Sequence, residues 1–272
     1  MRINTNINAM IATNQMTKNT ALAGSSMEKL STGLRITKAA DDATGLAISE
    51  KMRSQIRGME QAERNVQDGI SMVQTAEGAL EEAGNIAQRM RELGVQAGND
   101  TLSSSDRAKI KTELSELQKE MSDISKEAKF NGKELLSADA ASSTITIQAG
   151  ANSEVREIKM TDLASIANSV SITSDLSTVG AAQAFVGKVD KALEAINSGR
   201  STLGTIQNRL EYTANNLTTS TENLTAAESR IRDVDVAKEM VTLSKLNILN
   251  QASQAMVSQA KQQPESVSQL LR

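Results

Sequence analysis

Few side chains in this sequence could carry out covalent or acid–base chemistry. The 272 residues include no His and no Cys, so Ser–His–Asp triads, thiol nucleophiles, disulfides and His/Cys metal sites are excluded. The adjacent carboxylates of Asp41 and Asp42 could suggest an acid–base pair, but neighbouring residues of a helix point to different faces. We therefore predict that the protein is not an enzyme and uses no cofactor or metal.

The composition restricts the class of protein further. A net charge of −3 gives no strong electrostatic attraction to nucleic acid, and an aromatic content of 1% argues against a compact globular core. No run approaches the 18 apolar residues that a membrane span needs. The polar start (MRINTN) is followed by no apolar stretch, so we expect no cleaved signal peptide.

The elements that position these side chains are long helices. Apolar and small residues recur at alternating spacings of three and four, which places them in one stripe along a helix. We call such a stripe a seam. The first seam runs from Met59 to Ala97, the second from Ile110 to Ala128, and the third from Ala182 to Ile231. The first is rich in Gly and Ala, which lets the backbones of neighbouring helices approach closely. It fits either a helical rod or an ordinary bundle.

Turn residues divide the helices from a small β element. The stretch 98–100 (GND) predicts a helix end, and the serines at 103–105 predict the start of the second helix. Residues 130–133 (FNGK) predict a tight turn. Alternation by two over 144–148 and again over 155–160 predicts a β-hairpin, with a further short strand at 169–173.

Both ends of the chain predict amphipathic helices. One N-terminal stripe contains Ile3, Ile7, Met10, Asn14, Thr17, Ala21 and Gly24. The C-terminal segment has a broader stripe of Val236, Met240, Leu243, Leu246, Leu249, Ala252, Met256 and Ala260. Polar residues interrupt both stripes, so these helices either become ordered when an assembly supplies partners or pack on their own bundle.

Two connectors of mixed charge, 33–45 and 230–235, separate the ends from the seams. Their charges could pair within or between subunits. We expect a solvated surface by default, because exposed ion pairs contribute little to stability.

Several segments resemble bacterial flagellin, and the resemblance covers about 1–135 and 181–272. The matching segments are 1–6 (MRINTN), 30–36 (LSTGLRI), 41–48 (DDATGLAI), 67–71 (QDGIS), 75–80 (TAEGAL), 222–231 (ENLTAAESRI) and 270–272 (LLR). Motifs of this length in this order are highly specific.

The resemblance implies a mainly α fold. Long coiled-coil-like helices would form an elongated rod from 34–133 and 181–235, with a small β-hairpin region at 134–180. Terminal helices at 1–33 and 236–272 would pair in an inner core and be disordered in the monomer. Only 134–180 occupies the place where larger flagellins carry outer domains, so a short form is expected.

The resemblance also implies a function. The chain would be a structural subunit that self-assembles into the extracellular flagellar filament for swimming, exported through flagellar type III secretion. Implied partners are other copies of itself, the export apparatus, an export chaperone, and the filament cap and junction proteins.

Two sets of site residues follow. The subunit-packing candidates, which lie on the terminal stripes, are Ile3, Ile7, Met10, Met240, Leu243, Leu249 and Met256. A vertebrate innate immune receptor recognises many flagellins through the rod helices, and the matching positions are Arg89, Leu93 and Glu113. Since Arg89 and Leu93 fall outside the first seam, we expect both to face outward.

Two other functions compete with a filament subunit. A hook–filament junction protein shares the terminal helices, but the segment 222–231 and the final 270–272 favour the filament subunit. A soluble coiled-coil binding module predicts a fixed oligomer at all concentrations.

Overall fold

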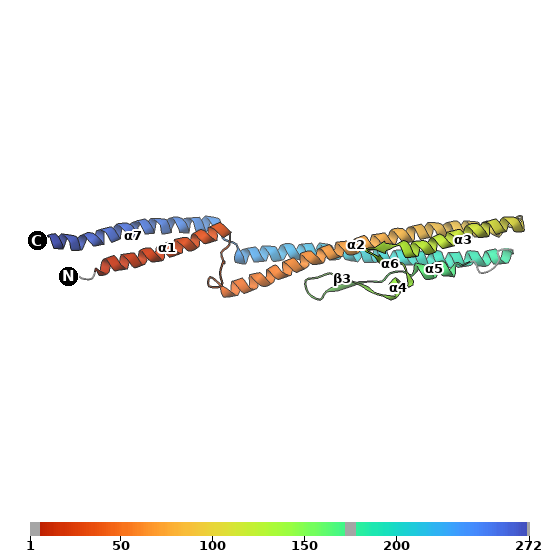
Figure 1. Ribbon diagram of the computed structural model, residues 1–272, viewed down its shortest axis with the longest axis horizontal. Helices are drawn as coiled ribbons and strands as arrows, with labels where there is room; N and C mark the ends of the chain where they lie inside the picture. The colour runs from red at the N-terminus through yellow and green to blue at the C-terminus, as the bar shows by residue number, and fades with distance from the viewer. Residues whose placement is uncertain (1–5, 172–177, 271–272) are drawn as a thin grey trace. The chain divides into compact units, whose positions relative to one another are not determined.

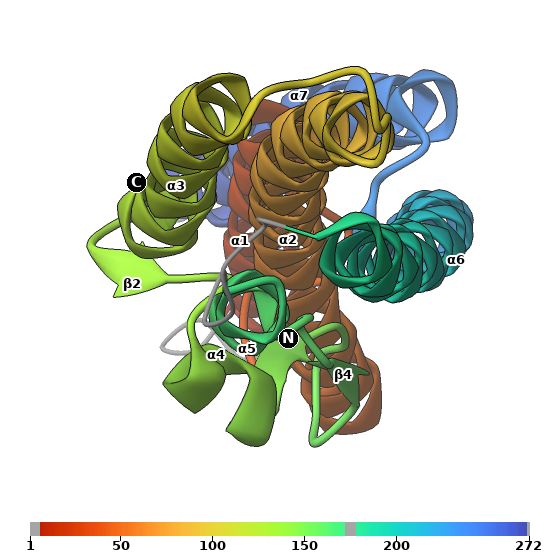
Figure 2. The ribbon, with the colours of Figure 1, turned by 90° about the vertical axis from the view of Figure 1, so that its right-hand side faces the viewer.

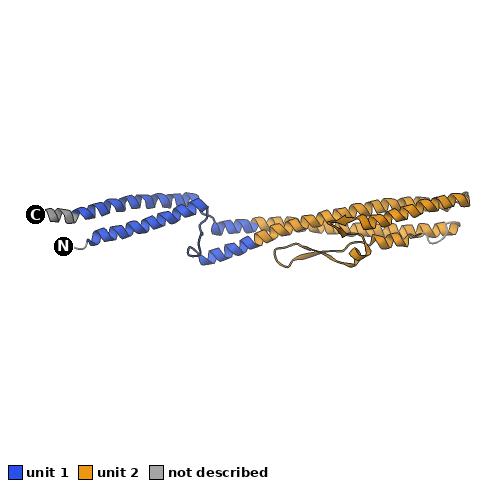
Figure 3. Ribbon diagram, viewed as in Figure 1, with its two compact units in different colours: residues 1–54, 223–272 blue, residues 55–222 orange. Residues whose placement is uncertain are grey.

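The computed structural model describes residues 6–171 and 178–270, and it contains two compact units (Figure 3). Unit 1 is drawn from residues 1–54 and 223–272, and unit 2 is residues 55–222. Within the described residues no helix carries an apolar stretch that could cross a bilayer.

Three long helices build most of unit 2, and two of them begin or end in unit 1. These are α2 (Ala43–Ala97), α3 (Ser104–Glu127) and α6 (Val179–Arg232), with α2 lying between α3 and α6 in Figure 2. Every residue of the first predicted seam is buried. The third seam is buried from Ala182 to Leu217 except at the half-buried Thr213. The predicted mainly α fold of long helices is confirmed, because the seams form the core.

Close approach at glycine explains part of the unusual composition of α2. A methyl group at Gly94 would lie 3.0 Å from the Phe185 ring of α6, and one at Gly69 would lie 2.1 Å from Ile147 Cδ1. The predicted close approach of a neighbouring helix is seen at Gly94, whereas the close neighbour of Gly69 is a side chain of strand β3. Gly78 is different, because it is exposed and a methyl group added there would have nothing within 4 Å.

Two small hairpins follow α3, as the turn signals predict. Strands β1 (Lys129–Phe130) and β2 (Lys133–Glu134) pair across Asn131 and Gly132, whose φ angles are 49° and 78°. Strands β3 (Ile145–Gln148) and β4 (Val155–Ile158) pair antiparallel, with Ile145 opposite Ile158. The predicted β-hairpin is confirmed.

Two short helices, α4 (Ala138–Ser142) and α5 (Leu163–Ser169), were not predicted. The strand expected at 169–173 is wrong at its start, because Ser169 ends α5 and Val170 caps it. Leu163 and Ala167 of α5 are buried, which draws this segment into a helix against the neighbouring α3. Ile172 and Thr173 lie outside the described residues.

In unit 1, α1 (Ile7–Thr32) and α7 (Val236–Leu270) run side by side in opposite directions (Figure 1). Helix α1 ends at Gly33, which adopts the left-handed conformation with φ 72°. A single antiparallel β-bridge joins Leu34 to Asp233, so the two connectors are tied to each other.

Candidate functional site

The side of α1 that faces α7 is lined by polar and small residues. Asn19 and Ser26 of α1 and Ser253 of α7 are buried, together with the larger Leu246 of α7. At the end of the pair, Asn6 Nδ2 donates a hydrogen bond of 2.6 Å to the carbonyl of Ala260. The paired helices therefore bury few large apolar side chains between them, and apolar burial is the main source of stability for a helix pair.

Most of the large apolar side chains described on these two helices point outward instead. The exposed ones are Ile7, Met10, Ile11, Leu22 and Met27 on α1, and Val236, Met240, Val241, Ile248, Leu249 and Met256 on α7. Unit 2 adds only Val95, Val155 and Tyr212 among the described residues. Apolar surface that one chain leaves uncovered in this way is typical of an interaction site.

The structure places six of the seven subunit-packing candidates. Five are exposed on α1 or α7: Ile7, Met10, Met240, Leu249 and Met256. Leu243 is half-buried, three residues before the buried Leu246, so it belongs to the side of α7 that faces α1. Ile3 lies outside the described residues.

Sequence reasoning missed which stripe of α1 faces α7. The described members of the predicted stripe, from Ile7 to Gly24, are all exposed. The covered stripe is Ala9, Ala12, Met16, Asn19, Ala23, Ser26 and Leu30. The same spacing of three and four runs through this second stripe, but it contains polar residues and so does not stand out as an apolar pattern in the sequence.

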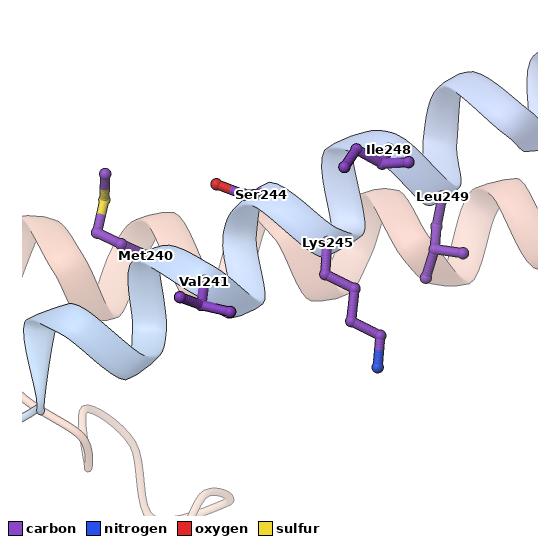
Figure 4. Close-up of a pocket in the computed structure, with 6 residues that line it drawn as sticks. All are labelled: Met240, Val241, Ser244, Lys245, Ile248 and Leu249. Atoms are coloured by element: carbon purple, nitrogen blue, oxygen red, sulfur yellow. The ribbon is translucent and has the colours of Figure 1, made fainter.

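A shallow apolar groove lies on the outward side of α7. It is lined by Met240, Val241, Ser244, Lys245, Ile248 and Leu249. Figure 4 shows these side chains on successive turns of the helix, with Lys245 as the one charged group among them. Such a groove can accept an apolar side chain, and Lys245 can pair with a carboxylate of the same partner.

The receptor-contact candidates occupy two environments. Arg89 Nη2 donates a 2.9 Å hydrogen bond to Glu113 of α3, and Nη1 donates one of 3.2 Å to Glu92. All three side chains are exposed. The hydrogen bond to Glu113, followed by that to Glu92, raises the pKa of Arg89 above its ordinary value.

The expectation that Leu93 faces outward is wrong. Its side chain is 3% exposed, although it lies outside the first seam. Leu93 follows Arg89 by one helical turn, on the side of α2 that pairs with Glu113 of α3. Since Leu93 is buried although it lies outside the first seam, α2 buries a wider stripe than a single seam.

Asp41 and Asp42 each accept hydrogen bonds from backbone N–H groups near the connector and do not form one shared site. Asp41 accepts hydrogen bonds from the backbone N–H groups of Thr37 and Lys38, each at 3.1 Å, and these bonds lower its pKa. Asp42 accepts one from the backbone of Gly45, in the first turn of α2, at 2.8 Å. Within the described residues no three acidic side chains come together as a metal site.

The default expectation of a solvated surface at the connectors is wrong for Arg232. Its side chain is buried, and Nη1 lies 2.5 Å from a carboxylate oxygen of Glu50. Arg35 donates from Nε to the carbonyl of Ile231 at 3.2 Å, and its backbone N–H donates to Arg232. Arg232 therefore pairs with Glu50 of α2, and Arg35 binds a backbone carbonyl of the other connector, to which the β-bridge also joins its own segment.

Comparison with known proteins identifies the family. The family model described as "Bacterial flagellin N-terminal helical region" matches residues 3–141, and "Bacterial flagellin C-terminal helical region" matches 186–271. The chain is 52% identical to a flagellin of Halalkalibacterium halodurans and 47% identical to one of Bacillus subtilis, with all of each chain covered. A crystal structure of Bacillus cereus flagellin matches with a TM-score of 0.51 and 32% identity, covering 61% of this chain and 94% of that one. The chain belongs to the bacterial flagellin family.

Proposed function

We propose that this chain is the structural subunit of a bacterial flagellar filament and that it polymerises through α1 and α7. The observation that carries the proposal is the exposed apolar surface of these two helices. Neighbouring copies would cover it, and the gain of apolar burial would drive growth of the filament. We propose head-to-tail contacts whose rotation does not close into a ring, because such contacts continue as a filament.

We assign the parts of the chain accordingly. Residues 1–33 and 236–272 form the inner core, 34–133 and 181–235 form the helical rod, and 134–180 form the small β-hairpin region. Burial of the polar Asn19, Ser26 and Ser253 between α1 and α7 gives the pair little apolar stabilisation of its own. This supports the proposal that α1 and α7 become fully ordered only when neighbouring copies pack on them.

The setting follows from this assignment. The filament is extracellular and transmits motor torque for swimming. The chain leaves the cell through flagellar type III secretion. Its partners on the way are the export apparatus and an export chaperone, and at the filament they are the cap and junction proteins.

A polymerisation assay on filament seeds tests the proposal. Ile248 is exposed at the centre of the α7 groove, so Ile248→Asp places a carboxylate where a neighbour would pack. We expect the minimum concentration for filament growth to rise by about a hundredfold, because an unpaired charge is costly to bury. The matched control, Ile248→Leu, keeps the surface apolar and should grow filaments like the parent chain.

The competing functions give other results under the electron microscope. A hook–filament junction protein would add to the seeds without extending them into long filaments. A soluble coiled-coil module would sediment as one fixed oligomer at every concentration, and Ile248→Asp would then leave the sedimentation unchanged.

We further propose that the surface shared by α2 and α3 contacts a vertebrate innate immune receptor. Arg89 and Glu113 support this, because they form one exposed pair that a partner can reach. Leu93, being buried, would act by holding this surface in shape. In a receptor reporter assay, Arg89→Ala and Glu113→Ala should each lower signalling, whereas Glu60→Ala, an exposed change elsewhere on α2, should not.

A further inference from the structure

The methionines divide sharply between the two units. In unit 2 the side chains of all five are buried: Met59, Met72, Met90, Met121 and Met160. In unit 1, Met10 and Met27 of α1 and Met240 and Met256 of α7 are each between 50% and 56% exposed. The remaining described methionines, Met16 and Met52, are half-buried. Among the described residues, the exposed methionines therefore lie on the two helices whose outer faces are apolar.

An exposed thioether reacts with peroxides. The sulfur attacks one peroxide oxygen, an S–O bond forms while the O–O bond breaks, and the second oxygen leaves as water. The methionine loses two electrons and becomes the sulfoxide, and the peroxide is reduced. Because the chain has no Cys, these four sulfurs have no thiol of the same chain to compete with them.

We propose that Met10, Met27, Met240 and Met256 form a reversible oxidation site that decides whether a free subunit can enter a filament. The inference rests on the proposed function. A sulfoxide is polar, so an oxidised face keeps its water and no longer packs against the apolar face of a neighbour. We expect oxidation of Met240 to weaken packing most, because Met240 lines the α7 groove together with Val241, Ile248 and Leu249.

Assembly and oxidation should therefore exclude each other. In a free subunit these four methionines are exposed, whereas in a filament neighbouring copies would cover them. Methionine sulfoxide reductases, one for each sulfoxide epimer, return the thioether and should restore the subunit.

The first experiment treats the free full-length chain with limiting hydrogen peroxide and locates the sulfoxides by peptide mass spectrometry. We expect Met10, Met27, Met240 and Met256 to be modified before any of the five buried methionines. The minimum concentration for growth on seeds should rise at least about tenfold, which is about 1.4 kcal/mol of lost association free energy per subunit. Both reductases together should reverse the change.

Substitution by leucine, which is close to methionine in volume and cannot be oxidised, provides the matched variants. The quadruple variant Met10→Leu, Met27→Leu, Met240→Leu, Met256→Leu should polymerise normally and keep this ability after peroxide. The double variant Met72→Leu, Met90→Leu changes two buried residues and should stay as sensitive as the parent chain. Equal inhibition of the quadruple variant and the parent would overturn the inference.

Two further results separate this inference from the proposed function. If the untreated parent chain fails to extend seeds, the proposed function fails and the oxidation site fails with it. If it extends seeds and its oxidised form does so at an unchanged concentration, the oxidation site alone is wrong. If the quadruple variant does not polymerise, the inference is tested instead by the rate at which the four methionines of the parent chain are oxidised. The four sulfurs should react at least about tenfold more slowly in filaments than in free subunits, and equal rates would overturn the inference.

Discussion

At the residue scale, Leu93 is a buried residue that lies next to an exposed ion pair on α2. It is buried, while Arg89, one turn earlier on the same side of α2, is exposed and paired with Glu113. A change at Leu93 would therefore move the residues around it as well as remove its own contacts. Any loss of receptor signalling in such a variant must be read together with its stability.

Truncation of Leu93 should destabilise unit 2. We expect Leu93→Ala to lower the free energy of unfolding by about 2–5 kcal/mol, because it removes a buried side chain and leaves a cavity. The matched control is Val95→Ala, two residues along the same helix, whose side chain is 57% exposed. Urea unfolding measures both variants, and equal shifts of the two midpoints would contradict the buried position of Leu93.

Asp41 gives a prediction about pH. Backbone N–H groups of Lys38 and Thr37, and then the Thr37 hydroxyl, lower its pKa below the ordinary 3.8. Since the folded pKa is depressed, the contribution to stability is present above pH 3.8 and is lost as the pH falls through the lowered value. An NMR titration should find the Asp41 pKa below 3.8, and Thr37→Val should raise it. An Asp41 pKa at or above 3.8 in the parent chain would contradict the hydrogen bonds from Lys38 and Thr37.

At the element scale, alanine substitution should affect stability differently at two glycines of α2. At Gly69 a methyl group would meet Ile147 Cδ1, the end of a buried side chain that would have to move, so Gly69→Ala should not bring the stabilisation that alanine usually gives a helix. At Gly78 nothing lies within 4 Å, so Gly78→Ala should stabilise it by about 0.5–1 kcal/mol. Thermal unfolding gives both values.

A second substitution checks the cause of the Gly69 effect. Ile147→Val removes the Cδ1 atom that the new methyl group would meet. The double variant Gly69→Ala, Ile147→Val should therefore be more stable than the sum of the two single changes implies. Additive effects would show that the contact between α2 and β3 is not the reason.

The long elements could be predicted from the sequence, and the short ones could not. A seam such as Met59 to Ala97 repeats often enough for its period to be unmistakable, and all of it is buried. Helices α4 and α5 are five and seven residues long, too short to show a period. Their capping residues were the only local signal: Ser137 and Asp162 each accept a hydrogen bond from the backbone three residues on.

At the scale of the whole molecule, the sequence predicts apolar faces but not what covers them. The N-terminal stripe from Ile7 to Gly24 has the right spacing for a core, yet it is exposed on the chain. Asn19, Ser26 and Ser253 face the partner helix instead. Periodicity identifies an apolar face, whereas the identity of its partner depends on tertiary and quaternary packing that a single sequence does not specify.

Removal of residues 236–272 tests the role of the C-terminal segment. We expect the shortened chain to keep the helical circular dichroism of unit 2, because its buried seams lie within residues 55–222. It should form no filaments on seeds, since the apolar face of α7 is gone. The parent chain is the control, and filaments of the shortened chain would contradict the assignment of α7.

The central claim is that neighbouring copies, rather than the chain alone, hold α1 and α7 in place. Amide hydrogen exchange, compared between dilute subunits and filaments, tests it most directly. In subunits we expect α1 and α7 to exchange far faster than the buried seam of α2, and in filaments to slow by at least about a hundredfold. Helices α1 and α7 that are as protected in dilute subunits as the seam of α2 would contradict the account.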